Sequence, residues 1–240
     1  MDKFFISLER TPERTERFIA ANSHINGLVH APGIDGKSLN RDAVTDAGLV
    51  HPACRFTVGA IGSGLTHIAL WGSIAKNRRP AHIFEDDAYL CKNFEAESER
   101  IIAGLDEEWE IILWGNNPDT TLKFALFPDI TPCVMRLSQQ SVQKNIDRFA
   151  QQEVAALAFR LDHTFGICGY AVSPKGAQTL LKGCLPLRGE AVCYDSLGGK
   201  TIIASSVDHL MNTIYPQIQA YVSFPPLCLT DNRAEHSLNA

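Results

Sequence analysis

The feature that most constrains the fold is a short apolar run that ends in three consecutive carboxylates. Residues 81–84 read Ala-His-Ile-Phe, and Glu85, Asp86 and Asp87 follow directly. An apolar run of this length favours a buried strand, and the three like charges at its end indicate that something positive lies beside them. Because side chains alternate along a strand, the sequence predicts that Glu85 and Asp87 share one face while Asp86 points to the other.

The carboxylates at this strand end suit a divalent cation. Carboxylate oxygens are hard ligands that bind Mg²⁺ or Mn²⁺, and such ions keep positions open for the phosphates of a nucleotide. Nucleotide-sugar chemistry is therefore the first interpretation. The alternative is a solvated acidic turn that caps the next helix, and the carboxylates alone leave both interpretations open.

Composition narrows the class of protein. The chain has 240 residues, of which 45% are hydrophobic and 20% charged, as expected for one substantial globular domain. Its net charge of -5 argues against a general nucleic-acid binder, which needs a basic surface. We find no apolar run near the roughly twenty residues that span a bilayer and no secretory leader, so we expect a cytoplasmic protein.

Predicted strands and helices alternate along the chain. Strands are expected at 3–8, 27–31, 81–84, 110–115 and 165–173, and helices from Pro12, at 59–76, 94–105, 138–159 and from Pro174. A Pro- and Gly-rich loop at 32–36 follows the second strand, where open α/β sheets build their sites. The pattern predicts an α/β sheet flanked by helices with an irregular C-terminal section, and no linker divides residues 1–240 into two domains.

Several motifs, in this order, resemble glycosyltransferase family 25, which includes bacterial lipopolysaccharide and lipooligosaccharide galactosyltransferases and relatives of collagen glycosyltransferases. Residues 62–67 (Gly-Ser-Gly-Leu-Thr-His), with Trp71 after them, resemble the family pattern Gly-Cys-x-Leu-Ser-His ahead of a tryptophan. Residues 83–87 (Ile-Phe-Glu-Asp-Asp) match its Ile-Leu-Glu-Asp-Asp element. Weaker similarities are residues 5–8 with Arg14, residues 34–36, 169–177, and 206–208, where Ser replaces the usual Pro of a Pro-Val-Asp element.

The resemblance implies a GT-A-like, Rossmann-type mixed sheet and a metal-dependent hexosyltransferase with a DXD-like motif. The implied donor is a UDP-sugar, with UDP-galactose first, held with Mn²⁺ or Mg²⁺. The implied acceptor is a saccharide hydroxyl on a bacterial glycolipid or oligosaccharide, reached at the cytoplasmic face of the inner membrane, where peripheral contact is expected. Residues 1–120 would mainly bind the nucleotide sugar and residues 121–240 the acceptor.

Site residues follow from the resemblance together with the chemistry of each side chain. Asp87 is the first candidate metal ligand, and His236 is a second if the C-terminus folds back. Donor-binding candidates are Ser7, Leu8, Arg14, Asp35, His67, Glu85 and Asp86. Arg14 and Asp35 have alternative roles in a surface salt bridge or a turn, and His67 has one as a packed helix residue.

An inverting β-galactosyltransferase also needs a base that takes the proton of the acceptor hydroxyl. Asp208 is the candidate, Asp195 is the fallback, and a cap of the following helix is the alternative role of Asp208. Two other functions remain open, a nucleotidyltransferase of similar fold and a catalytically silent carbohydrate-binding or assembly protein.

Overall fold

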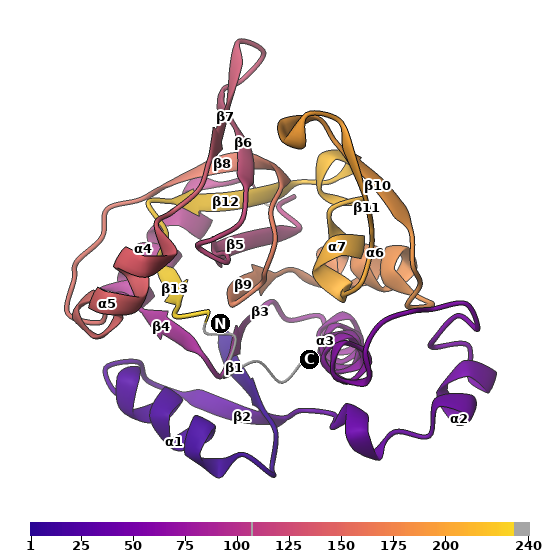
Figure 1. Cartoon of the computed structure of the whole chain (residues 1–240). Helices are drawn as coiled ribbons and strands as arrows, with labels where there is room; N and C mark the ends of the chain where they lie inside the picture. The colour runs from indigo at the N-terminus through magenta and orange to yellow at the C-terminus, as the bar shows by residue number, and fades with distance from the viewer. Residues whose placement is uncertain (107, 233–240) are drawn as a thin grey trace.

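A nine-stranded mixed sheet organises the computed structural model, which describes residues 1–106 and 108–232 (Figure 1). The strand order is β2-β1-β3-β9-β5-β12-β8-β6-β7. The strands are β1 (Asp2–Ser7), β2 (Leu28–Pro32), β3 (Ala81–Glu85), β5 (Ile111–Gly115), β6 (Leu122–Phe127), β7 (Thr131–Met135), β8 (Leu157–His163), β9 (Gly169–Val172) and β12 (Ala220–Phe224). Strands β1, β2 and β3 are mutually parallel, so their carboxyl ends meet at one edge.

Helices cover both faces of this sheet. They are α1 (Pro12–Ala21), α2 (Arg41–Asp46), α3 (Val58–Asn77), α4 (Phe94–Gly104), α5 (Gln139–Phe149), α6 (Pro174–Cys184) and α7 (Val207–Met211). Short two-stranded sheets pair β4 (Ala88–Leu90) with β13 (Cys228–Thr230) and β10 (Ala191–Tyr194) with β11 (Lys200–Ile203). The predicted α/β class, a mixed sheet flanked by helices, is confirmed.

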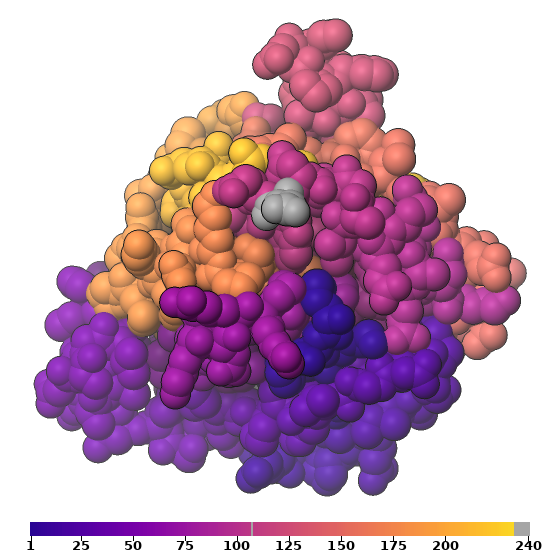
Figure 2. All heavy atoms as spheres, turned by 180° about the vertical axis from the view of Figure 1, so that it is seen from behind, coloured from indigo at the N-terminus to yellow at the C-terminus, as the bar shows by residue number. Residues whose placement is uncertain are grey.

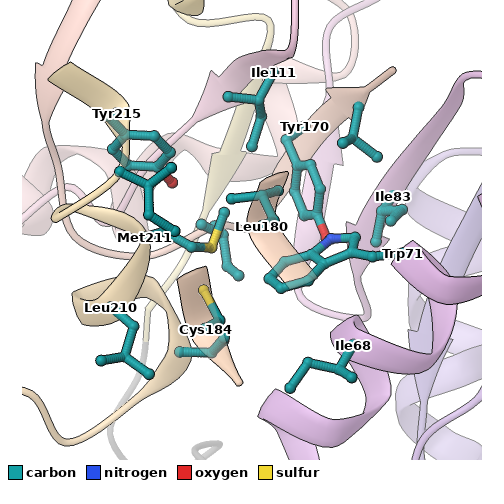
Figure 3. Packing of buried hydrophobic residues seen from close by; sticks show 14 of the residues in the cluster. Ile68, Trp71, Ile83, Ile111, Tyr170, Leu180, Cys184, Leu210, Met211 and Tyr215 are labelled. Atoms are coloured by element: carbon teal, nitrogen blue, oxygen red, sulfur yellow. The ribbon is translucent and has the colours of Figure 1, made fainter. Parts of the chain in front are cut away.

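Alternation along the central strands produces two hydrophobic cores. In β3, Ile83 packs into the core under α3 and α6, while Phe84 packs into the core formed with α1 and α4. On the first face Trp71 and Tyr170 are fully buried beside Leu180, and the Trp71 indole points at the Tyr170 hydroxyl (Figure 3). Tyr170 is thus a core residue, as its position in a buried strand suggests.

Helix α3 is long and apolar enough to cross a membrane by length and composition alone, which corrects the expectation that no such segment exists. In the fold it is a core helix, and 56% of its most apolar window is buried. The Thr57 hydroxyl accepts a hydrogen bond from the Ala60 amide and so caps its first turn. Its amino end lies beside the carboxyl ends of β1 and β3.

Three regions differ from the sequence prediction. Residues 220–224, expected within an irregular C-terminal section, form β12, which lies between β5 and β8 in the main sheet. The helix expected over 138–159 ends at Phe149, and Leu157 to His163 form β8, because this segment finds strand partners in β12 and β6. The hairpin of β6 and β7 was not predicted, and it projects beyond the rest of the molecule in both views (Figures 1 and 2). Local propensity does not reveal such pairings, since they depend on distant partners.

Candidate active site

A cleft of about 210 Å³, the first cleft, lies at the carboxyl ends of β1, β2 and β3. Among its lining residues are eight that the sequence analysis singled out: Ser7, Leu8, Arg14, Asp35, His67, Glu85, Asp86 and Asp87. They come together because parallel strands deliver their C-terminal loops to the same edge, which is where open α/β sheets bind ligands.

The loop after β2 forms one wall of the first cleft. The Gly33 amide donates to the Ser7 carbonyl at 2.8 Å, and the Ile34 amide donates to the Thr66 hydroxyl at 2.8 Å. A side chain at Gly62 of α3 would overlap the Ile34 carbonyl oxygen, so the loop lies directly on the helix backbone. Glycine at position 62 is therefore required for the close approach that shapes this wall.

Asp35 stands at the rim of the first cleft. Its carboxylate accepts from the Lys37 amide at 3.0 Å and from the Arg10 guanidinium at 2.6 Å. The Lys37 hydrogen bond, and after it the Arg10 hydrogen bond, lower the pKa of Asp35. Asp35 is thus both a turn residue and a lining residue, and the two roles offered for it are compatible.

The acidic run is divided by the end of its strand. Strand β3 ends at Glu85, and Asp86 and Asp87 lie in the turn to β4, so the strict alternation predicted for all three carboxylates stops at Glu85. Asp86 is buried and accepts the Arg14 Nε–H at 2.9 Å, with a second contact from Arg14 Nη2. Arg14 is therefore a positive partner of the run, and Asp86 orients it.

The acidic turn does not cap the next helix, so that alternative is wrong. Helix α4 begins at Phe94, beyond β4, and Asn93 occupies its N-cap position. Asp87 instead directly precedes β4, in which Ala88 pairs with Thr230 of the C-terminal strand β13. Burial, and then the charge of Glu85, raise the pKa of Asp87 to about 7.

Asp87 also offers a test of whether the site fits a divalent cation. Its Oδ1 is shielded from solvent and has no hydrogen-bond partner among the described residues, an uncommon state for a buried polar atom. In residues 1–106 and 108–232 no group of three or more His, Cys, Asp or Glu side chains is arranged to hold a metal. A divalent cation at this turn would therefore need most of its ligands from phosphate and water.

A hydrogen-bond chain from the core ends at His67, which faces Glu85. Trp71 Nε1 donates to the Tyr170 hydroxyl at 2.9 Å, and that hydroxyl lies 2.8 Å from His67 Nδ1. With the Tyr170 proton directed to Nδ1, the His67 Nε2–H faces Glu85 Oε1 at 3.7 Å. His67 is 1% exposed, so it is both a packed helix residue and part of the cleft lining.

A second cleft of about 570 Å³ adjoins the first, and both are lined by Ser63, Glu85 and Asn117. Asp208 lines this second cleft. Its Oδ2 accepts the Gly166 amide at 2.8 Å, and its Oδ1 accepts the Ser206 hydroxyl. Ser206, not Asp208, is the N-cap residue of α7, so the capping role considered for Asp208 is wrong.

The fallback base candidate, Asp195, does not line either cleft. Its side chain is 75% exposed, and it pairs with Lys123 at 2.7 Å. The structure therefore favours Asp208 over the fallback, because a base must reach the bound acceptor. His236, the second candidate metal ligand, lies outside the described residues.

Sequence reasoning missed several lining residues. Asn117 follows the end of β5 in the polar stretch 116–117, a signal of the same kind as the carboxylates after β3. Ser63 was recognised only as part of the motif at residues 62–67 and not as a site residue. Asn232 lines the first cleft because the chain returns to it late in the sequence, where β13 pairs with β4 next to the acidic turn. No local sequence pattern predicts this return.

Comparison with known proteins identifies relatives of this arrangement. The model of glycosyltransferase family 25 (LPS biosynthesis protein) matches residues 1–197. The human protein "Inactive glycosyltransferase 25 family member 3" is 30% identical over 133 residues, which are 48% of this chain and 22% of that protein. A glycosyltransferase 25 family member from Drosophila pseudoobscura pseudoobscura is 32% identical over 126 residues, 47% of this chain and 20% of that protein.

The chain thus matches about a fifth of the length of these two relatives. Among solved structures, a mannose-1-phosphate geranyltransferase from Thermus thermophilus covers 92% of this chain, with 72% of its own chain matched. The TM-score is 0.37 and the sequence identity 10%.

Proposed function

Because this chain belongs to glycosyltransferase family 25, we propose that it transfers a hexose from a UDP-sugar to a saccharide hydroxyl. The observation that carries the proposal is the junction of the two clefts at Ser63, Glu85 and Asn117. A donor in one cleft and an acceptor in the other would meet beside the acidic turn. The first cleft, lined mainly by residues before 120, takes the nucleotide sugar, and the second takes the acceptor.

The acidic turn would hold a Mn²⁺ or Mg²⁺ ion with the donor. Asp87 is the first ligand and Glu85 is the second, directly or through water, because both carboxylates line the first cleft. The ion would supply positive charge to the diphosphate of the departing UDP. Asp86 acts through Arg14, which it holds at the wall of the first cleft, where a guanidinium can donate to phosphate oxygens.

In an inverting transfer, the acceptor oxygen bonds to the anomeric carbon while the bond from that carbon to the diphosphate oxygen breaks. UDP leaves with the electron pair, and the acceptor proton passes to a carboxylate. Asp208 has this role in our proposal, since it lines the second cleft. Each of its oxygens already accepts one hydrogen bond, which fixes its orientation and leaves a second lone pair for the proton.

The assignment of the donor sugar and of the acceptor follows from the family alone. We propose galactose as the sugar and a lipopolysaccharide or lipooligosaccharide as the acceptor, modified at the cytoplasmic face of the inner membrane. Glucose and N-acetylhexosamines differ from galactose by few contacts, so the donor screen must include them.

The test is release of UDP from a panel of UDP-hexoses with Mn²⁺, with and without oligosaccharide acceptors. The wild-type protein should release UDP slowly from one donor and faster with an acceptor. Asp87→Asn should abolish the release, and Asp208→Asn should reduce the acceptor-dependent rate by about 100-fold or more, the usual contribution of a general base. Asp195→Asn is the matched control, because its carboxylate lies outside both clefts, and it should retain activity.

A catalytically silent carbohydrate-binding protein is the second candidate, favoured by the human relative whose name states that it is inactive. This function predicts sugar binding without UDP release from any donor. Release of pyrophosphate from a nucleoside triphosphate would instead indicate a nucleotidyltransferase. Full metal-dependent activity in Asp87→Asn would contradict the ligand that we assign.

A further inference from the structure

The hairpin of β6 and β7 carries an exposed apolar tip, which comprises residues 126–134. Within it the exposed fractions are 37% for Leu126, 58% for Phe127, 81% for Ile130 and 50% for Val134. Figure 2 shows this hairpin standing clear of the molecular surface. Scattered single apolar residues are ordinary on a protein surface, but several large ones gathered on one projection indicate an interaction site.

The charge of the tip limits what it can contact. From residue 124 to residue 135 the sequence contains no lysine or arginine, and Asp129 at the turn is the one charged residue. The chain as a whole carries a net charge of -5. Basic side chains lie nearer the base of the hairpin, where Arg160 and Lys123 line a groove with Phe127 and Ile130, and Lys123 is paired with Asp162 and Asp195. The tip itself therefore offers no basic complement to an anionic partner.

The size and shape of the tip also limit its partner. A stable protein interface buries about 800 Å² on each side, with a well-packed centre. One side of the tip borders a groove of about 400 Å³ that Arg160 and Pro216 also line. The tip itself is a two-stranded projection with a few large apolar side chains, which offers much less area than that. It does match the interfacial layer of a lipid bilayer, where apolar side chains enter the boundary between head groups and acyl chains.

We propose that the apolar tip of the β6–β7 hairpin inserts into a lipid surface. The residues that flank the hairpin, Thr121 and Arg136, both line the second cleft. Insertion of the tip would thus hold the mouth of that cleft close to the bilayer. The attachment is apolar, so it requires neither anionic lipid nor catalytic turnover.

Sedimentation with vesicles of pure phosphatidylcholine tests this proposal on the full chain. Phe127→Ser and Ile130→Ser should each lower the vesicle partition coefficient by about tenfold or more, as expected for removing a large buried apolar side chain. The matched control is Ile19→Ser on α1, which removes an isoleucine that is 49% exposed on another part of the molecule and should bind like the wild type. Raising the salt concentration should leave binding unchanged.

A second measurement reports where the tip lies. The native tryptophans Trp71, Trp109 and Trp114 are buried, so Ile130→Trp adds an exposed fluorophore. Its emission should shift to the blue with vesicles and be quenched by brominated acyl chains. Because tip side chains pack against little, all variants should keep the wild-type thermal unfolding midpoint.

Three results would overturn the proposal. The first is equal vesicle binding by the wild type, Phe127→Ser and Ile130→Ser. The second is binding only to anionic vesicles, with loss in salt. The third is self-association without lipid, seen by light scattering and removed by the same variants, since the tip would then contact a second copy. None of these measurements depends on UDP release, so they test lipid binding independently of the proposed transferase activity.

Discussion

Replacing Asp87 by asparagine should make the protein relatively more stable as the pH rises, while removing its ability to bind a divalent cation. The reason is the shielded position of this carboxylate beside Glu85, which raises its pKa to about 7. In an unfolded chain the pKa of an aspartate is about 3.9. Between these two values the native protein therefore binds one more proton than the unfolded chain.

The sign of the pH effect follows from this difference. Stability falls with rising pH wherever the native state holds more protons, so the Asp87 carboxylate destabilises the fold increasingly from about pH 4 to about pH 7. Integration between pH 5 and pH 8 gives a loss of about 2 to 3 kcal/mol, and about 4 kcal/mol is the limit for the full shift. Asparagine does not titrate, so the variant lacks this loss at every pH.

The assay is chemical denaturation of the wild type and Asp87→Asn at several pH values from 5 to 8. The free energy of unfolding of the variant minus that of the wild type should increase by about 2 to 3 kcal/mol from pH 5 to pH 8. Burying the asparagine amide adds a cost that does not depend on pH, so it does not change this increase. Titrating groups far from Asp87 are common to both proteins, so their contributions cancel. Asp46→Asn, which changes an exposed carboxylate at the end of α2, should show no such trend.

The same denaturation experiment, repeated with a divalent cation, measures binding of the ion. Mn²⁺ at about 100 times its dissociation constant should stabilise the wild type by about 2.7 kcal/mol and Asp87→Asn by far less. A stability difference between variant and wild type that stays constant from pH 5 to pH 8 would refute the argument from burial and the Glu85 charge. Equal stabilisation of both proteins by Mn²⁺ would refute the argument that Asp87 holds the ion.

Three further predictions concern the residues that support the site. Arg14→Leu should lower the free energy of unfolding, measured by denaturation, by about 3 to 5 kcal/mol, because it leaves the buried Asp86 carboxylate without the Arg14 guanidinium. The double variant with Asp86→Leu should recover most of this stability. Gly62→Ala should lower the free energy of unfolding by about 1 to 3 kcal/mol and weaken UDP binding in calorimetry, because its Cβ would overlap the loop after β2. The control is Gly72→Ala in the same helix, whose Cβ would meet nothing within 4 Å, and this variant should be more stable by about 0.5 to 1 kcal/mol. Tyr170→Phe should lower the free energy of unfolding by about 1 to 3 kcal/mol, because the Trp71 N–H loses its acceptor in the core. An unchanged unfolding midpoint would argue against the buried hydrogen bonds of Trp71 and His67 with Tyr170.

Local patterns in the sequence were enough to predict the central strands, most of the helices and the position of the site along the chain. The patterns are apolar runs for β1, β3 and β5, and helical spacing over α3. The loop at 32–36 was predicted to line a site because it follows a strand of an α/β sheet. The family resemblance, not the spacing of the residues, placed Asp35 and the acidic run in one donor site.

The role of each carboxylate in the acidic run depends on the fold and could not be predicted. Glu85, Asp86 and Asp87 are adjacent in sequence, but the strand ends between the first and the second, and their partners come from α1, α3 and β13, far away along the chain. The same is true of β8 and the hairpin, whose pairings depend on distant strands. Burial and charge neutralisation are properties of the surroundings, so a local pattern indicates where a site lies and the fold assigns the role of each side chain in it.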